Sequence, residues 1–160
     1  MMADPCCAPV EHRDEVEACP GCCHQGRQVA LITVQTQVNV SLRELAAAPY
    51  HICATPGCAV VYYAVGAPPL MRAQVREPFF PKETTPDVLV CHCFRHSLGA
   101  LQGSDTAGGS AILADIIAGT RQGQCACALR NPQGRCCLGD VRRLIRGDKL
   151  KMNQEDEEAR

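Results

Sequence analysis

Thirteen cysteines among 160 residues constrain the fold of this chain more than any other feature of its sequence. The total is odd, so the cysteines cannot all pair in disulfides within one chain. The first residues contain neither a basic segment nor an apolar one, so they do not resemble a secretory signal. The sequence therefore predicts a reducing, cytoplasmic location, where cysteines hold metals more often than they form disulfides.

Charge and apolar patterning exclude two classes of partner. The chain has 16 basic and 17 acidic side chains and a formal net charge of −1, so no general attraction to nucleic acid or to a membrane surface is expected. The longest segment without charged side chains, residues 45–71, contains four prolines and cannot form a membrane-spanning helix. Aromatic residues make up only 4% of the chain, so something besides apolar burial has to stabilise the fold.

The residue pattern divides the chain into four parts. We expect a flexible leader over residues 1–18, a β module over 19–80, a helical module over 87–150 and an acidic tail over 151–160. The two modules are joined by a proline-rich connector over residues 79–86. The predicted fold class is therefore α+β.

The β module is expected to contain two main strands. Residues 29–40 are rich in β-branched side chains and alternate in their second half, and residues 59–65 (AVVYYAV) precede Gly66 and two prolines. A short helical segment over 42–48 and an extended piece over 71–75 complete the module.

The helical module is expected to contain three helices. They cover residues 94–101, 110–118 and 138–150, where apolar side chains recur at helical spacing. Ser110 is the predicted N-cap of the second helix and Gly119 its end.

Four cysteines of the β module have the spacing of a structural zinc site. They are Cys19, Cys22, Cys53 and Cys58. Two close pairs, delivered from either side of a hairpin, complete a tetrahedron of thiolates with Zn–S bonds of about 2.3 Å. Cys23 and His24 are alternative ligands, and plain burial of the thiols is the alternative to a metal.

Six cysteines of the helical module form a second, denser group. They are Cys91, Cys93, Cys125, Cys127, Cys136 and Cys137. Four thiolates drawn from these six suit a [2Fe–2S] cluster. The start of the helix after Cys137 and the nearby Arg135 offset the negative charge of such a cluster. A second zinc site and thiol redox chemistry fit the same spacings and stay open.

The motifs that contain these cysteines resemble a known family. The segments CPGCCHQGRQV, YHICATPGC, CHCF and CACALRNPQGRCCLG, within residues 19–146, are similar to the N-terminal metal domain of the CopZ copper chaperones. The later half also resembles bacterioferritin-associated ferredoxins. The CopZ domain carries one zinc ion and one [2Fe–2S] cluster, so the resemblance implies a small zinc-stapled β module followed by a helical [2Fe–2S]-binding module.

Carried over motif by motif, the resemblance implies which cysteines bind which group. For zinc it implies Cys19, Cys22, Cys53 and Cys58, and for the cluster Cys91, Cys93, Cys127 and Cys137. Cys125 and Cys136 are then left as non-ligands. The ferredoxins place their third ligand at the position of Cys125, whereas the NP-x-G motif that begins at Asn131 favours Cys127.

One departure from the family narrows the expected function. CopZ chaperones carry a second domain with an M-x-C-x-x-C copper-binding loop, and these 160 residues contain no such motif. The resemblance therefore implies the redox part: electron transfer, or reduction of Cu(II) to Cu(I), for a separate copper-handling partner such as a chaperone or a copper ATPase, or for another redox partner. The chain is expected to be a redox protein rather than a classical enzyme.

Two other function classes stay open. A non-redox adaptor would use its metals only to stabilise the fold and would recruit a partner through Arg142, Arg143 and Arg146. A copper-sequestration protein would load Cu(I) on its many thiols, including the unassigned Cys6, Cys7 and Cys23.

Overall fold

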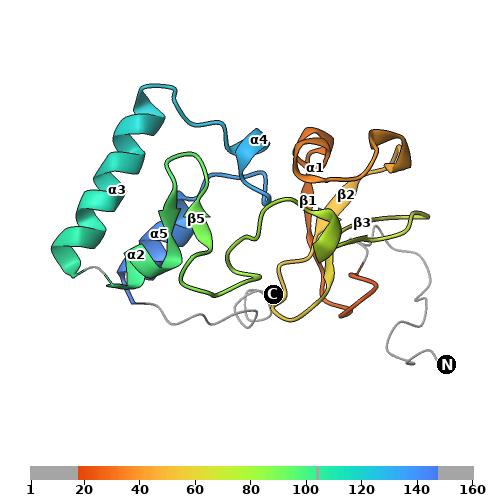
Figure 1. Cartoon of the computed structure of the whole chain (residues 1–160), viewed down its shortest axis with the longest axis horizontal. Coiled ribbons are helices and arrows are strands. Elements are labelled where there is room, and N and C mark those ends of the chain that lie inside the picture. Colours follow the sequence, from red (N-terminus) through yellow and green to blue (C-terminus); the bar gives the residue numbers. More distant parts are fainter. Residues whose placement is uncertain (1–17, 104, 148–160) are drawn as a thin grey trace, which may run out of the picture.

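A four-stranded antiparallel sheet forms the first half of the structure, a computed structural model that describes residues 18–103 and 105–147. Cys6, Cys7 and the predicted acidic tail lie outside the described residues. The strands follow one another across the sheet in chain order: β1 (Arg27–Val29), β2 (Tyr50–Ile52), β3 (Val60–Ala64) and β4 (Leu70–Met71). All five residues of β3 are buried, so this strand is the centre of the sheet half (residues 18–79; Figure 1).

The predicted long strand over residues 29–40 is wrong. Only its first residue belongs to β1, and the chain then turns into helix α1 (Leu31–Gln37). The side chains that α1 buries are Thr33, Val34 and Gln37, which share one helical face rather than alternating. Tertiary contacts have overridden the β propensity of the branched side chains.

Two short 3-10 segments lie where the sequence predicted a helical segment and an extended piece in this half. The first, η2 (Leu42–Glu44), lies within the predicted helical segment, and its N-cap Ser41 accepts a hydrogen bond from the backbone N–H of Arg43. The second, η3 (Arg72–Gln74), replaces most of the extended piece expected over 71–75.

The helical half (residues 80–147) begins with a small hairpin and continues into helices. Its elements are β5 (Leu89–Cys91), β6 (His96–Ser97), α2 (Leu98–Gly103), α3 (Thr106–Arg121), α4 (Cys127–Arg130) and α5 (Leu138–Ile145). In Figure 1 helices α2, α3 and α5 gather on the side away from the sheet, while α4 reaches across to α1. The predicted α+β class is confirmed: a small sheet with a four-cysteine site precedes the helices.

The boundaries of the first two predicted helices need correction. The segment over 94–101 is helical only from Leu98, because Arg95 takes a left-handed backbone conformation (φ 65°) and turns the β5–β6 hairpin. Helix α3 starts at Thr106 with Asp105 as its N-cap, not Ser110, and runs past Gly119. Gly119 is there for packing, since a Cβ atom at this position would lie 2.3 Å from Cζ of Phe94.

The third predicted helix begins where expected, with Cys137 as the N-cap of α5. It ends at Ile145, ahead of Gly147 in the left-handed conformation (φ 69°), a common helix stop. Residues 148–150 of the prediction lie outside the described part of the chain.

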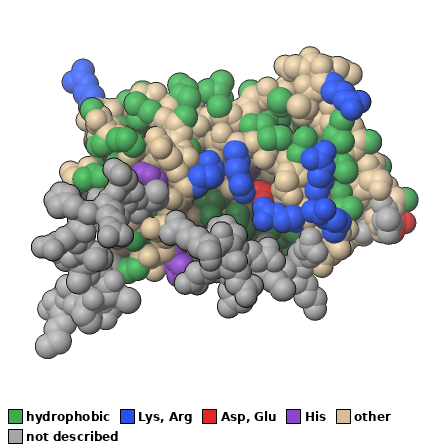
Figure 2. Space-filling view, turned by 180° about the vertical axis from the view of Figure 1, so that it is seen from behind, with side chains coloured by type: hydrophobic (Ala, Val, Ile, Leu, Met, Phe, Trp, Pro, Cys, Tyr) green, Lys and Arg blue, Asp and Glu red, His purple; other side chains and the backbone are tan. Residues whose placement is uncertain are grey.

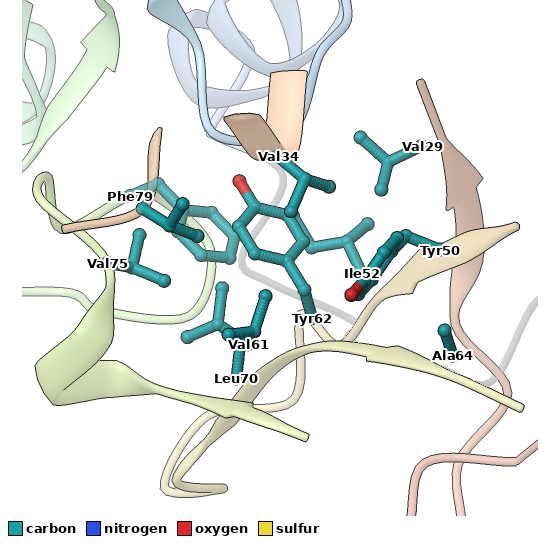
Figure 3. Close-up of a cluster of buried hydrophobic side chains, with 11 residues drawn as sticks. Val29, Val34, Tyr50, Ile52, Val61, Tyr62, Ala64, Leu70, Val75 and Phe79 are labelled. Carbon is teal, nitrogen blue, oxygen red and sulfur yellow. The ribbon is translucent and has the colours of Figure 1, made fainter. Parts of the chain in front are cut away.

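Each half has its own hydrophobic core, and the boundary falls between two neighbouring phenylalanines. Phe79 packs in the sheet half, where Figure 3 shows the Tyr62 ring at the centre of the cluster beside Val34 and Ile52. Phe80 packs with the helices in the second core. The start of the connector is therefore anchored in both cores by apolar burial.

The halves are joined through helix α4 and the loop that follows it. Thr33 Oγ1 donates a hydrogen bond to the carbonyl oxygen of Ala128 (2.7 Å), and Gln37 Nε2 donates to that of Leu129 (2.9 Å). The buried Tyr62 hydroxyl donates to the carbonyl oxygen of Pro132. These bonds hold α4, which begins at Cys127, and the start of the next loop against the sheet half.

We expect Gly134→Ala to lower the free energy of unfolding by about 2–4 kcal/mol. About 1 kcal/mol comes from the left-handed backbone (φ 64°), and the rest from a clash, because a Cβ atom would lie 2.7 Å from Thr33 Oγ1. Urea unfolding followed by circular dichroism measures the loss. Gly123→Ala is the matched control, since Gly123 has a similar φ of 70° but no atom within 4 Å of the added Cβ. Equal losses in both variants would contradict the packing argument.

Charge on the surface is unevenly distributed. Figure 2, the view from behind, shows most visible Lys and Arg side chains in the middle of the molecule and over its helical half. Among the described residues, no helix combines the length and apolar character needed to cross a membrane.

Candidate metal centres

Four cysteine sulfurs converge at one end of the sheet. The Sγ atoms of Cys19, Cys22, Cys53 and Cys58 all lie within 4.8 Å of one another. Cys19 Sγ is 3.8 Å from Cys58 Sγ, and Cys22 Sγ is 3.6 Å from Cys53 Sγ. A tetrahedral ion with Zn–S bonds of about 2.3 Å separates its sulfurs by about 3.8 Å. The four thiols therefore fit a zinc ion.

Two turns bring these sulfurs together. Cys19 and Cys22 lie in the turn ahead of β1, and the other pair lies in the connection between β2 and β3. Gly21 lets the turns approach, since a Cβ atom there would lie 3.0 Å from Cys58 Sγ and 2.9 Å from a Val60 methyl group. Its backbone N–H donates to Cys19 Sγ at 3.4 Å. The alternative ligands Cys23 and His24 are not members of the converging group.

A buried lysine compensates the charge of the site. Lys82 is only 5% exposed, and its Nζ donates to the carbonyl oxygens of Cys53 (3.1 Å) and Thr55 (3.2 Å). The same Nζ lies 3.8 Å from Cys53 Sγ. Four thiolates around a divalent ion carry net negative charge, which a nearby ammonium group stabilises. The sequence gives no signal for this role, because Lys82 lies in the connector, 24 residues beyond the last cysteine of the group.

The thiols of the site differ in acidity. Burial raises the pKa of Cys19 and of Cys58. Burial acts in the same direction on Cys22, but hydrogen bonds with Thr55 and His24 outweigh it and lower the pKa of Cys22 to about 6. Without a metal, part of the site is therefore protonated at neutral pH. Zinc has to displace these protons, so its affinity rises with pH.

The second cysteine group forms two pairs. Cys93 Sγ lies 3.8 Å from Cys127 Sγ and accepts a hydrogen bond from the backbone N–H of Ala126 at 3.2 Å. In the other pair, a hydrogen bond from the Cys137 thiol lowers the pKa of Cys91 to about 6 and raises that of Cys137. The charge of Cys127 also raises the pKa of Cys137, so the two pairs are neighbours.

The remaining two cysteines lie at the margin of this group. Cys136 is exposed and Cys125 is half-buried. Burial, followed by the charges of Cys93, Cys136 and Cys125, raises the pKa of Cys127 to about 12. Both marginal thiols are therefore within electrostatic range of the pairs.

A buried polar network shapes the loop between α4 and α5. Asn131, only 2% exposed, donates to the carbonyl oxygen of Arg135 (2.7 Å) and accepts from the backbone N–H of Gln133 (3.0 Å). Arg135 pairs with the buried Asp140 at 3.4 Å, which partly neutralises the charge expected to face the cysteines. The NP-x-G motif in the sequence indicated this loop. Nothing in the sequence indicated the role of Asp140.

Comparisons with known proteins agree with this geometry. Residues 16–76 match the family model of the CopZ zinc-binding domain. The chain is 27% identical over 126 residues to the copper chaperone CopZ of Archaeoglobus fulgidus, a match that covers 79% of this chain and 60% of that protein. The crystal structure of the N-terminal domain of the Archaeoglobus fulgidus CopZ has a TM-score of 0.59 and 25% identity, over 79% of this chain and 96% of that one. The first half of this chain is thus a CopZ-like zinc-binding domain, and the structural likeness continues into the second half.

Proposed function

We propose that this chain is an electron-transfer protein of copper handling. In this proposal zinc on Cys19, Cys22, Cys53 and Cys58 stabilises the fold. Cys91, Cys93, Cys127 and Cys137 hold a [2Fe–2S] cluster. The observation that carries the proposal is the arrangement of the second set of thiols as two neighbouring pairs.

The pairing favours two metal atoms over one. A single tetrahedral ion needs all of its sulfurs within about 4 Å of one another. Among the described residues, only the first set has three or more such ligands within 4.8 Å. A [2Fe–2S] cluster takes two cysteines on each iron, which matches a Cys93–Cys127 pair beside a Cys91–Cys137 pair.

The surrounding groups suit a negatively charged cluster. When bound, such a cluster supplies one-electron transfer. The backbone N–H of Ala126 donates to Cys93 Sγ, and hydrogen bonds to ligand sulfurs raise a reduction potential. Cys137 is the N-cap of α5, so its sulfur lies near the positive end of that helix. These groups stabilise the reduced, more negative state.

Copper enters the proposal as the cargo. The chain spans about 60% of the length of its relative, which is a copper chaperone. We infer that this protein passes one electron, received from a separate donor, to Cu(II), and that the Cu(I) formed goes to a copper-handling partner, a chaperone or a copper ATPase.

Metal analysis and visible spectroscopy of the anaerobically purified full chain test this function. We expect about two iron, two sulfide and one zinc per chain, and a red-brown colour that dithionite bleaches. Adding Cu(II) to the reduced protein should restore the colour while a Cu(I)-specific chelator reports product. A colourless protein that holds only zinc after cluster reconstitution would contradict the redox function and favour a non-redox adaptor.

A further inference from the structure

A pocket of about 180 Å³ opens beside the second cysteine group and belongs to neither metal centre. Three arginines line it: Arg76, Arg95 and Arg130. Gln37, Glu77 and His92 also line it. These residues come from helix α1, the segment after η3, the β5–β6 hairpin and helix α4, so both halves of the chain contribute.

Buried polar atoms without partners belong to side chains that line this pocket. Among the residues that the structure describes, three buried side-chain atoms lack a hydrogen-bond partner, and two of them, Gln37 Oε1 and His92 Nδ1, belong to its lining. The two side chains are 4% and 3% exposed. Buried polar groups are nearly always hydrogen-bonded, so these two atoms show that the lining is not fully satisfied by the protein itself.

The charges of the lining select a negatively charged occupant. Three guanidinium groups oppose the one carboxylate of Glu77. Arg95 Nη1 and His92 Nδ1 lie 3.9 and 3.8 Å from that carboxylate, which is too far for hydrogen bonds. Guanidinium groups bind oxyanions through charge-assisted hydrogen bonds, and three of them can engage separate oxygens of one tetrahedral anion.

The acceptors of the lining select an occupant that also donates. Gln37 Nε2 donates to the carbonyl oxygen of Leu129, so Oε1 of this lining side chain, which can only accept, is left without a partner. The Glu77 carboxylate is a second acceptor. Hydrogen phosphate carries a proton on one oxygen, whereas sulfate carries none. We propose that this pocket binds hydrogen phosphate in preference to sulfate.

Two residues that line the pocket are close in sequence to the second cysteine group. His92 lies between Cys91 and Cys93 in the sequence, and Arg130 ends the short helix that Cys127 begins. A bound phosphate would place negative charge among residues that neighbour Cys91, Cys93 and Cys127 along the chain. The proposed phosphate binding uses none of these cysteines, so it does not depend on which metal they hold.

Isothermal titration calorimetry of the metal-loaded full chain with inorganic phosphate tests the proposal. We expect saturable binding of about one phosphate per chain, weakened about ten- to hundred-fold in Arg130→Gln, because a charge-assisted hydrogen bond is lost. The matched control is Arg121→Gln, an exposed arginine at the end of α3 that does not line the pocket, and it should bind as the parent does. Sulfate should bind at least about ten-fold more weakly, and Glu77→Gln should reduce this preference.

Three results would overturn the proposal. They are no saturable phosphate binding through the millimolar range, equal weakening in Arg130→Gln and in the control, and equal affinity for phosphate and sulfate. Circular dichroism and metal content check that Arg130→Gln folds. If it does not, Arg95→Gln replaces it, because Arg95 lines the same pocket from the hairpin turn and is not part of α4.

Discussion

Cys19→Ser is expected to abolish zinc binding and to unfold the sheet half at neutral pH. The Cys19 side chain is fully buried within the converging thiols, and a serine hydroxyl is a much poorer zinc ligand than a thiolate. Structural zinc in small domains contributes about 10 kcal/mol or more to folding, which is comparable to the whole stability of a typical domain. Zinc content and the thermal unfolding curve measure the effect.

Cys136→Ser is the matched control for this substitution. It makes the same chemical change at an exposed cysteine outside both proposed ligand sets, so zinc content and melting temperature should stay at the parent values. A Cys19→Ser protein that keeps its zinc and its cooperative transition would show that the converging thiols are not a structural metal site.

Cys127→Ser is expected to remove the visible absorption of the anaerobic protein, whereas Cys125→Ser should keep it. The first substitution breaks the pair that Cys127 Sγ forms with Cys93 Sγ at 3.8 Å, and the second changes a half-buried thiol at the margin. Iron should fall from about two per chain to nearly none in Cys127→Ser, since a [2Fe–2S] cluster needs its full set of ligands. Absorption spectra and iron analysis measure both variants.

The opposite outcome would reassign the third ligand. If Cys125→Ser loses the colour and Cys127→Ser keeps it, the loop follows the ferredoxin pattern rather than the CopZ pattern. Cys137→Ser and Cys136→Ser form a second matched comparison with the same logic, since Cys137 is buried and Cys136 is exposed.

The cysteine pattern was informative because its chemistry is local. The Pro-Gly turn between Cys19 and Cys22 specifies its own geometry and has the spacing of a zinc-ligand pair, so its convergence with a second close pair could be predicted. The α+β class followed from the change from strand-forming to helix-forming patterns along the chain. The central strand also followed from its sequence, because β3 is a run of strand-forming residues that are all buried.

The wrong predictions concern segments whose structure depends on contacts with residues far away in the sequence. Nothing near residues 31–37 shows that Thr33 and Gln37 bond to carbonyl groups more than 90 residues away, and those bonds favour a helix over a strand. Lys82 was missed for the same reason, because only the folded chain brings its Nζ to Cys53. The start of α3 was a different error, since Asp105 is as good an N-cap as Ser110 and the pattern alone could not choose between them.

The hydrogen bonds between the two halves imply an order for the loading of metals into this protein. Helix α4, which begins at Cys127, and the loop after it accept hydrogen bonds from Thr33, Gln37 and Tyr62, all in the sheet half. Those donors are in place only after the sheet half has folded, and we expect that folding to depend on zinc. Under the proposed function, zinc supply should therefore limit how much of the chain receives iron and sulfide, and protein made without enough zinc should also be poor in iron.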